Sequence, residues 1–345
     1  MNRFLYSFII WLGIPFALLK ILLKDSHDPS WKVKLKNQLG FVPKISDRVI
    51  WIHSVSVGEF NASKPLVDNL LDQYPKYKIL LTTTTITGSV AVKNHYKNKI
   101  IHCFFPFDSK LIIKSFLRKI QPEICILMET EIWPNLIHTI NKKNIPVCLI
   151  NARLSEKSFN KYQKFSPKLV SETLRKLTLI CSQNTFSSTR FIKLGANEES
   201  LINTGSLKFD SDDSIDVDLA NSLRQMVGDR LVSVFASTRD GEERLIIESY
   251  LKHKDQMNCL LVIIPRHPER FDEAAKIAKG FGLNVNRRSE AENCSEDTDI
   301  LVGDSMGEMM AYYSISDIAF IGGSLTDNGC QNMLEAASLS KPIIF

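Results

Sequence analysis

The chain has 345 residues, of which 44% are hydrophobic and 23% are charged, with 15 Gly and 13 Pro. This composition is typical of globular proteins and excludes a disordered or collagen-like chain, while the length favours two domains. The net charge of +5 is too small to indicate nucleic-acid binding. Because the seven cysteines form no Cys-x-x-Cys pair, we expect reduced thiols in a cytoplasmic body and no structural zinc.

The N-terminus, residues 1–24, is predicted to be a membrane anchor. The run Phe4–Leu23 contains about 20 residues, enough to span a bilayer, and Lys20 is its only charge. Lysines follow the run, which favours a cytoplasmic location for the body. Gly13 and Pro15 are expected to interrupt the middle, so a helix lying in the membrane face and a buried core helix stay open as alternatives.

Residues 25–210 alternate between β-rich runs and stretches with helical spacing, which predicts βαβ units and a parallel sheet. Amphipathic helices are expected at Pro65–Gln73 and Leu111–Ile120. The expected strands are Val49–His53, Ile79–Thr84, Ile101–Phe105, Ile124–Met128, Val147–Ile150, Leu177–Cys181 and Leu201–Thr204.

A second α/β series is expected in residues 211–345, after the acidic, Ser-rich segment Asp210–Asp218, which has the composition of a linker. Pro342–Phe345 has the pattern of a further strand, so we expect this domain to be incomplete. The other expected strands are Leu231–Phe235, Leu260–Ile264, Leu283–Asn286, Ile300–Val302 and Ile318–Ile321.

Two acidic motifs follow strands of the first domain. In His53–Glu59, small residues lead from a strand into a helix, whose N-terminus favours an ionised Glu59. Glu129 and Glu131 come after the strand Ile124–Met128, at the end of a strand where α/β enzymes place working groups. Each motif has a purely structural alternative, as a helix-dipole carboxylate or a capping cluster.

Three motifs at the ends of second-domain strands together predict a nucleotide site. Arg266, in Ile264–Arg270, has the planar fork that binds phosphate in a bidentate manner. The other two motifs are the turn 303–308 and the Gly-Gly-Ser turn 322–324 with residues 332–335. Lys208 lies between the two domains, either as an anion-binding residue or as a solvated lysine.

Eight strings, in order along the chain, resemble those of the 3-deoxy-D-manno-octulosonic acid (Kdo) transferases, the lipid IV(A) Kdo transferases of lipopolysaccharide synthesis. They are HSVSVGE, TTTTITGS, METEIWPN, NARLSEKS, TGSLKFD, IPRHPERF, GDSMGE and IGGSL. The order of so many strings makes the resemblance specific. Two positions depart from the family pattern, because Gln331 stands where the family has His, and Met333 where it has Pro.

The resemblance implies an α/β fold of the GT-B type, in which two Rossmann-like domains face a cleft. It implies that residues 25–210 bind the acceptor and residues 211–345 the nucleotide sugar, in an apparently C-terminally shortened chain. Glu59 corresponds to the catalytic base, and Glu129, Glu131 and Lys208 to the transition-state or acceptor site. The residues that correspond to CMP-Kdo ligands are Pro265, Arg266, His267, Met306, Gly307, Glu308, Ser324, Asn332, Met333, Leu334 and Glu335.

By the same resemblance, the donor is CMP-Kdo and the acceptor is a lipid A precursor, lipid IV(A), at the cytoplasmic side of the inner membrane. A carboxylate base and a cationic phosphate site suffice for this transfer, so no metal and no cofactor is expected. Inner-membrane lipids are expected partners of the anchor, and nucleic acid is not. A related GT-B sugar-nucleotide enzyme and an inactive anchored remnant are the alternatives.

Overall fold

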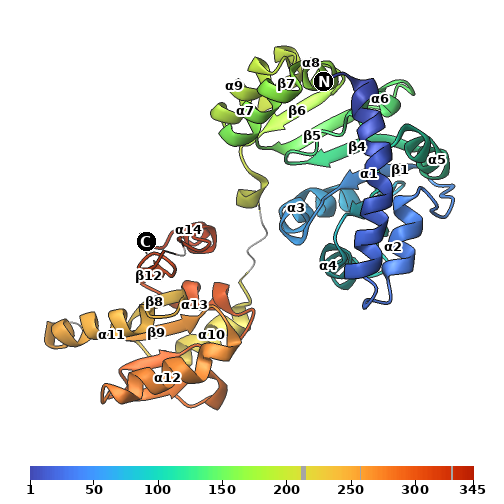
Figure 1. Cartoon of the computed structure of the whole chain (residues 1–345). Helices are drawn as coiled ribbons and strands as arrows, with labels where there is room; N and C mark the ends of the chain where they lie inside the picture. The colour runs from blue at the N-terminus through green and yellow to red at the C-terminus, as the bar shows by residue number, and fades with distance from the viewer. Residues whose placement is uncertain (211–214, 257, 328) are drawn as a thin grey trace. The chain divides into compact units, whose positions relative to one another are not determined.

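The computed structural model of the chain describes residues 1–210, 215–256, 258–327 and 329–345. The chain divides into two compact units, residues 1–211 (unit 1) and 212–345 (unit 2), shown in Figure 1. The expected linker Asp210–Asp218 includes residues 211–214, which lie outside the described residues.

Within the described part of unit 1, seven parallel strands form one sheet in the order β3-β2-β1-β4-β5-β6-β7. The strands are β1 (Val49–His53), β2 (Lys78–Thr83), β3 (Ile101–Phe104), β4 (Pro122–Met128), β5 (Val147–Ala152), β6 (Leu179–Ser182) and β7 (Leu201–Asn203). The helices are α1 (Arg3–Lys24), α2 (Trp31–Gln38), α3 (Val57–Gln73), α4 (Ile86–Tyr96), α5 (Lys110–Ile120), α6 (Pro134–Asn141), α7 (Glu156–Phe165), α8 (Pro167–Leu174) and α9 (Thr185–Lys193), with the 3-10 turns η1 (Glu198–Ser200) and η2 (Leu207–Asp210).

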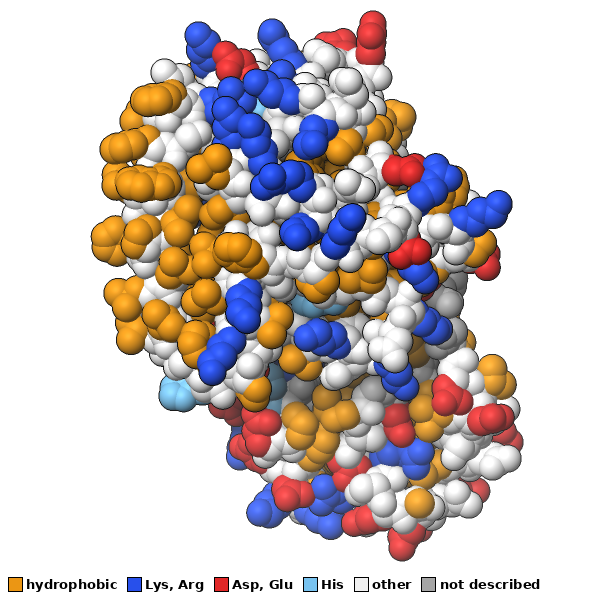
Figure 2. All heavy atoms as spheres, turned by 90° about the vertical axis from the view of Figure 1, so that its right-hand side faces the viewer, with side chains coloured by type: hydrophobic (Ala, Val, Ile, Leu, Met, Phe, Trp, Pro, Cys, Tyr) orange, Lys and Arg blue, Asp and Glu red, His pale blue; other side chains and the backbone are white. Residues whose placement is uncertain are grey.

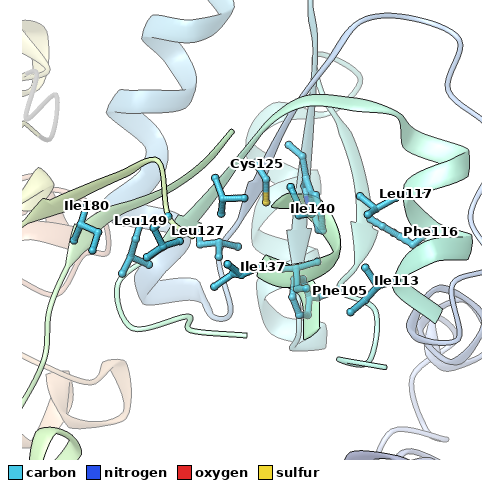
Figure 3. Close-up of a cluster of buried hydrophobic side chains, with 14 of the residues drawn as sticks. Phe105, Ile113, Phe116, Leu117, Cys125, Leu127, Ile137, Ile140, Leu149 and Ile180 are labelled. Atoms are coloured by element: carbon cyan, nitrogen blue, oxygen red, sulfur yellow. The ribbon is translucent and has the colours of Figure 1, made fainter. Parts of the chain in front are cut away.

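Hydrophobic cores on both faces of this sheet explain why its strands are almost continuously apolar. All five residues of β1 are buried. One core contains Trp51, Phe116 and Ile137, and Figure 3 shows side chains of α5, β4 and α6 meeting there. The other contains Phe60 of α3 and Val92 of α4.

The described residues of unit 2 form a second parallel sheet of six strands in the order β10-β11-β9-β8-β12-β13. These are β8 (Leu231–Thr238), β9 (Cys259–Pro265), β10 (Val285–Arg287), β11 (Ile300–Val302), β12 (Ile318–Ile321) and β13 (Ile343–Ile344). The helices are α10 (Val217–Val227), α11 (Glu242–His253), α12 (Phe271–Gly280), α13 (Met309–Ile315) and α14 (Leu334–Ser338), with the 3-10 turns η3 (Lys254–Gln256), η4 (Pro268–Arg270) and η5 (Arg288–Glu290).

Both sheets therefore have the strand order of a doubly wound fold. Every expected strand is present; β1, β11 and β12 have the expected bounds, and the others are shifted at one or both ends. The order reverses between β1 and β4 in unit 1 and between β8 and β12 in unit 2. In open α/β sheets, ligands bind outside the carboxyl ends of the strands at such a reversal. Each unit thus has one place where a site is expected.

Two helices continue through a proline, and one of them differs from the sequence expectation for that reason. The expected interruption at Gly13 and Pro15 is wrong, since α1 runs unbroken from Arg3 to Lys24. The amphipathic stretch expected at Pro65–Gln73 is the second half of α3, which begins at Val57 and has Glu59 in its first turn, as expected from the His53–Glu59 motif. A proline inside a helix removes one N–H donor, and the turns on either side supply the remaining hydrogen bonds.

Candidate active site

Glu59 lies in the first turn of α3, directly after β1. The Ser56 hydroxyl caps the helix by accepting from the Glu59 N–H (3.5 Å), and the Val55 N–H donates to Glu59 Oε2 (2.6 Å). This reciprocal arrangement resembles a capping box and fixes the carboxylate at the carboxyl end of the sheet. The side chain is half-buried.

The pKa of Glu59 is raised to about 7, opposite in direction to the expected effect of the helix N-terminus. Burial is the largest cause, and the negative charges of Glu131 and Glu129 add to it. The hydrogen bond from Val55 opposes them without cancelling the rise. Desolvation and like charges both disfavour the ionised carboxyl group. A carboxyl group with this pKa exchanges protons readily at neutral pH.

Glu131 belongs to the same site because β4, which precedes it, is the neighbour of β1 in the sheet. Its Oε2 accepts from Trp133 Nε1 (2.6 Å) and lies 3.7 Å from His53 Nε2. His53 is fully buried and stacks on Phe105, with ring centroids 3.7 Å apart. Contact between His53 Nδ1 and the Thr82 carbonyl oxygen (3.0 Å) assigns the proton to Nδ1. Among the described residues, His53 Nε2 has no hydrogen-bond partner.

Glu129 adopts a left-handed backbone conformation, with φ of 52°. Its N–H donates to the Ile150 carbonyl oxygen (3.0 Å), and the hydroxyl of the next residue, Thr130, donates to the Arg153 carbonyl oxygen (2.6 Å). These bonds hold the sharp turn that follows β4. Non-glycine residues in this conformation carry backbone strain and are concentrated at functional sites.

Lys208 lies in η2, which contacts α3, the helix that carries Glu59. The turn is attached to the sheet by the Leu207 N–H, which donates to Asn151 Oδ1 (3.1 Å). Asn151 is buried near the end of β5 and also has a left-handed backbone, with φ of 54°. The fold thus brings the Lys208 segment to the helix of the carboxylate site.

Unit 2 has a cavity of about 220 Å³ at the carboxyl ends of β8, β9 and β11, next to the point where the strand order reverses. Seven residues predicted from the sequence line it: Pro265, Arg266, Met306, Gly307, Glu308, Asn332 and Glu335. Strands far apart in the sequence therefore supply one site.

Four predicted donor residues do not line this cavity. His267 contacts Arg239, with Nε2 and Nη1 3.0 Å apart, and the Ser324 hydroxyl donates to the Ile321 carbonyl oxygen (2.7 Å). Met333 packs on the core of unit 2, and Leu334 begins α14. These residues support the loops around the cavity.

The sequence analysis missed the lining residues Ser237 and Tyr312, whereas Ser305 belongs to the predicted turn 303–308 and Gln331 is one of the two positions that depart from the family pattern. Ser237, with φ of 55°, lies within the last residues of β8, so its position at a strand end was a usable signal. Tyr312 lies in α13, four residues after the N-cap Glu308, so the two residues are about one helical turn apart. The Ser305 hydroxyl contacts Tyr312 Oη at 3.1 Å.

The cavity is lined by the cationic Arg266 and by Glu308, whose carboxylate is held by specific contacts. Arg266 is exposed at the cavity, where a phosphate can reach its guanidinium. Glu308 Oε2 accepts from Arg288 Nε (3.2 Å) and from the Ser305 hydroxyl (2.7 Å). Glu308 is thus paired, which reduces its repulsion of an anionic ligand. In the described part of the chain, no group of three or more His, Cys, Asp or Glu residues is arranged to hold a metal ion.

Comparison with known proteins identifies the family. The profile described as "3-Deoxy-D-manno-octulosonic-acid transferase (kdotransferase)" matches residues 33–211. A 3-deoxy-D-manno-octulosonic acid transferase of Haemophilus influenzae is 38% identical over all of this chain and 82% of its own length. One from Bordetella pertussis is 34% identical over 86% of this chain and 70% of its own length.

The fold is shared more widely than the sequence. A UDP-GlcNAc 2-epimerase from Methanocaldococcus jannaschii aligns with a TM-score of 0.54 over 86% of this chain and 83% of its own, at 14% identity. Identity at that level shows the shared two-unit α/β fold of the GT-B type and nothing about activity. With 38% identity along its whole length, the chain belongs to the 3-deoxy-D-manno-octulosonic acid transferase family.

Proposed function

We propose that the protein transfers Kdo from CMP-Kdo to a lipid A precursor, lipid IV(A), with Glu59 as the general base. The observation that carries the proposal is the Glu59 carboxyl group, fixed at the strand-order reversal of unit 1 with a pKa of about 7. A general base works best when its pKa is close to the working pH. Family membership supports Kdo transfer as the reaction.

In the proposed reaction, a hydroxyl oxygen of the lipid A precursor attacks the anomeric carbon of Kdo. The bond between that carbon and the phosphate oxygen of CMP breaks, CMP leaves as an anion, and the hydroxyl proton passes to Glu59. Burial, together with the negative charges of Glu131 and Glu129, keeps the pKa of Glu59 high enough for it to accept the proton. Their negative charges also suit a transition state with positive charge on the sugar carbon.

The cavity of unit 2 is the proposed CMP-Kdo site. Arg266 supplies a planar cation for the phosphate, and the turn at Gly307, with φ of 81°, brings backbone N–H groups to the same cavity. Because these groups stabilise the charge on the departing CMP, we propose that the transfer requires no divalent cation and no cofactor.

The N-terminal helix supports attachment to the inner membrane, with the body on the cytoplasmic side. Within the described residues, α1 is long and apolar enough to cross a membrane by length and composition, and almost none of it is buried. Attachment would hold the protein at the surface that contains its lipid acceptor.

A transfer assay tests this function directly. Purified protein in mixed detergent micelles is given CMP-Kdo and lipid IV(A), with and without EDTA, and the glycolipid product is measured by mass spectrometry. We expect a mass increase of one or more Kdo residues in both samples. Donor hydrolysis without glycolipid product contradicts the acceptor assignment, and activity lost in EDTA and restored by a cation contradicts metal independence.

A further inference from the structure

Helix α1 has two opposite faces, and one of them is a wide apolar stripe. Phe4 is 84% exposed, Trp11 65% and Phe16 75%, and Phe8, Leu19 and Leu23 are exposed as well. At 3.6 residues per turn, these six side chains lie within one arc of about 140°. We call them the apolar stripe. Figure 2 shows hydrophobic side chains gathered along the left edge of unit 1, where α1 lies.

The opposite face of α1 is docked on unit 1 at both ends of the helix. Near the start, the Tyr6 hydroxyl donates to Asp108 Oδ2 (2.7 Å) and the Ser7 hydroxyl to Asn135 Oδ1 (2.9 Å). Near the end, Ile21 is only 6% exposed. Figure 1 shows α1 lying across the unit beside α2 and α6. The folded body therefore runs alongside the whole length of the helix.

This docking cannot be combined with a transmembrane orientation. The 22 residues of α1 cover about 33 Å, which is the thickness of the hydrocarbon core. If α1 crossed the bilayer, the segments docked at both of its ends would enter the hydrocarbon with it. These include the carboxyl group of Asp108 and the ion pair between Lys34 and Asp25 (2.8 Å). Charged groups at that depth are strongly unfavourable.

We propose that α1 does not cross the bilayer but lies in the plane of an anionic lipid surface, with the apolar stripe among the acyl chains. This proposal rests on the membrane attachment proposed above and specifies its geometry. A helix that contacts protein on one side and exposes apolar side chains on the other meets lipid with the exposed side alone.

The charge distribution identifies the lipid surface as anionic. Residues 1–44 contain seven Lys and Arg against two Asp, and the rest of the chain contains 36 residues of each sign. The whole net charge of +5 therefore lies in α1, α2 and their connections. Lys20, Lys24, Lys32 and Lys36 are exposed there. In Figure 2, Lys and Arg side chains are scattered over the surface next to the hydrophobic edge. Basic residues beside an apolar stripe strengthen binding to anionic headgroups.

Cysteine labelling distinguishes the two orientations. Asn2→Cys and Lys24→Cys, at opposite ends of α1, are placed in a Cys330→Ser background, which removes the exposed native thiol. Inverted inner-membrane vesicles are treated with a membrane-impermeant maleimide, before and after detergent. We expect both positions to react before detergent. Labelling of Asn2→Cys only after detergent, with Lys24→Cys reactive throughout, overturns the in-plane orientation.

A second measurement tests the apolar stripe itself. Phe16→Glu is compared with Phe186→Glu, since Phe186 of α9 is equally exposed, at 77%, but lies outside the stripe. In flotation with phosphatidylcholine–phosphatidylglycerol vesicles, we expect Phe16→Glu to lower binding at least tenfold and Phe186→Glu to leave it unchanged. Equal binding of both variants overturns the role of the stripe.

The salt dependence and the activity complete the test. Binding should fall as NaCl rises and should be weaker to vesicles of phosphatidylcholine alone. Equal binding to the two lipid mixtures contradicts the anionic surface. Transfer in detergent micelles should be the same for Phe16→Glu and wild type. If the membrane proposal is wrong, all variants still transfer Kdo in micelles. If the proposed function is wrong, no variant and no wild-type protein transfers Kdo.

Discussion

Replacing Glu59 by Gln separates a catalytic role of this side chain from a structural one. The amide oxygen of Gln can still accept the N–H of Val55, so the capping bond is kept, while the ability to take a proton is lost. If Glu59 is the general base, transfer falls by roughly 10²–10⁴-fold. Folding and donor binding stay intact.

Because the pKa of Glu59 is raised, Glu59→Gln should also change how the stability of the protein depends on pH. Because folding raises the pKa of Glu59 from 4.5 to about 7, the wild-type protein loses stability as the pH rises through this interval. The full difference corresponds to about 3 kcal/mol, and partial exposure of the side chain reduces it to roughly 1–2 kcal/mol. Gln does not ionise, so Glu59→Gln should be more stable than wild type at pH 8, by roughly 2–8 °C in Tm. At pH 4, below the ordinary pKa, this gain should vanish.

The assay is single-turnover Kdo transfer between pH 5.5 and 8.5, with calorimetry on the same preparations. The wild-type rate should rise about tenfold per pH unit below 7 and level off above it, because the base must be ionised. Glu156→Gln is the matched control, since Glu156 also lies in the first turn of a helix in unit 1 but is 76% exposed. Near wild-type transfer by Glu59→Gln, or a lower Tm at pH 8, would refute the reasoning.

Three further substitutions test unit 2. Arg266→Ala should weaken CMP-Kdo binding by about 1.5–3 kcal/mol, roughly 10- to 150-fold in Kd by calorimetry, because a charged hydrogen bond to phosphate is lost. Gly323→Ala should cost about 1–3 kcal/mol in denaturant unfolding, because φ is 84° and a Cβ would overlap the Gly329 carbonyl oxygen. Arg270→Ala should cost about 3–5 kcal/mol, because Arg270 binds both carboxylate oxygens of the fully buried Glu243.

Two of these substitutions, Arg266→Ala and Gly323→Ala, have a control in the same unit. Arg244 is exposed on α11 outside the cavity, so Arg244→Ala should leave the donor Kd unchanged. Gly282 also has a positive φ but open space around it, so Gly282→Ala should cost less than Gly323→Ala. An unchanged Kd for Arg266→Ala, or equal costs for the two glycine variants, contradicts the respective role.

The sequence predicted the strands well because each is a short apolar run that ends in a turn signal. The run at Val49–His53 has the same bounds in the structure. Helix α3 was predicted only in parts, as a start close to Glu59 and an amphipathic stretch Pro65–Gln73, because a proline such as Pro65 is typical of a first turn although it lies within α3. A single sequence does not reveal the order of strands in a sheet. The structure was therefore needed to show that β1 and β4 are neighbours and that Glu59 lies close to Glu131.

The parts of the site that sequence reasoning missed depend on distance in three dimensions. The pKa of Glu59 was expected to be held down by the helix N-terminus, but burial and two carboxylates that are 70 or more residues away raise it. The docking of α1 depends on the bond between Tyr6 and Asp108, which are 102 positions apart. The hydrophobicity of a segment does not distinguish a helix that crosses a membrane from a helix that packs on the surface of a protein.

The docked face of α1 has a practical consequence for preparing a soluble form of the protein. Helix α1 covers a cavity of about 380 Å³ whose floor includes Phe105, Phe107 and Trp133. Deleting residues 1–24 would expose these aromatic rings and remove the Tyr6 hydroxyl that donates to the buried Asp108. The deletion would therefore replace the exposed apolar stripe with another exposed apolar surface. Polar substitutions within the apolar stripe should give a detergent-independent protein instead, because they change the lipid side of the helix and keep its protein side.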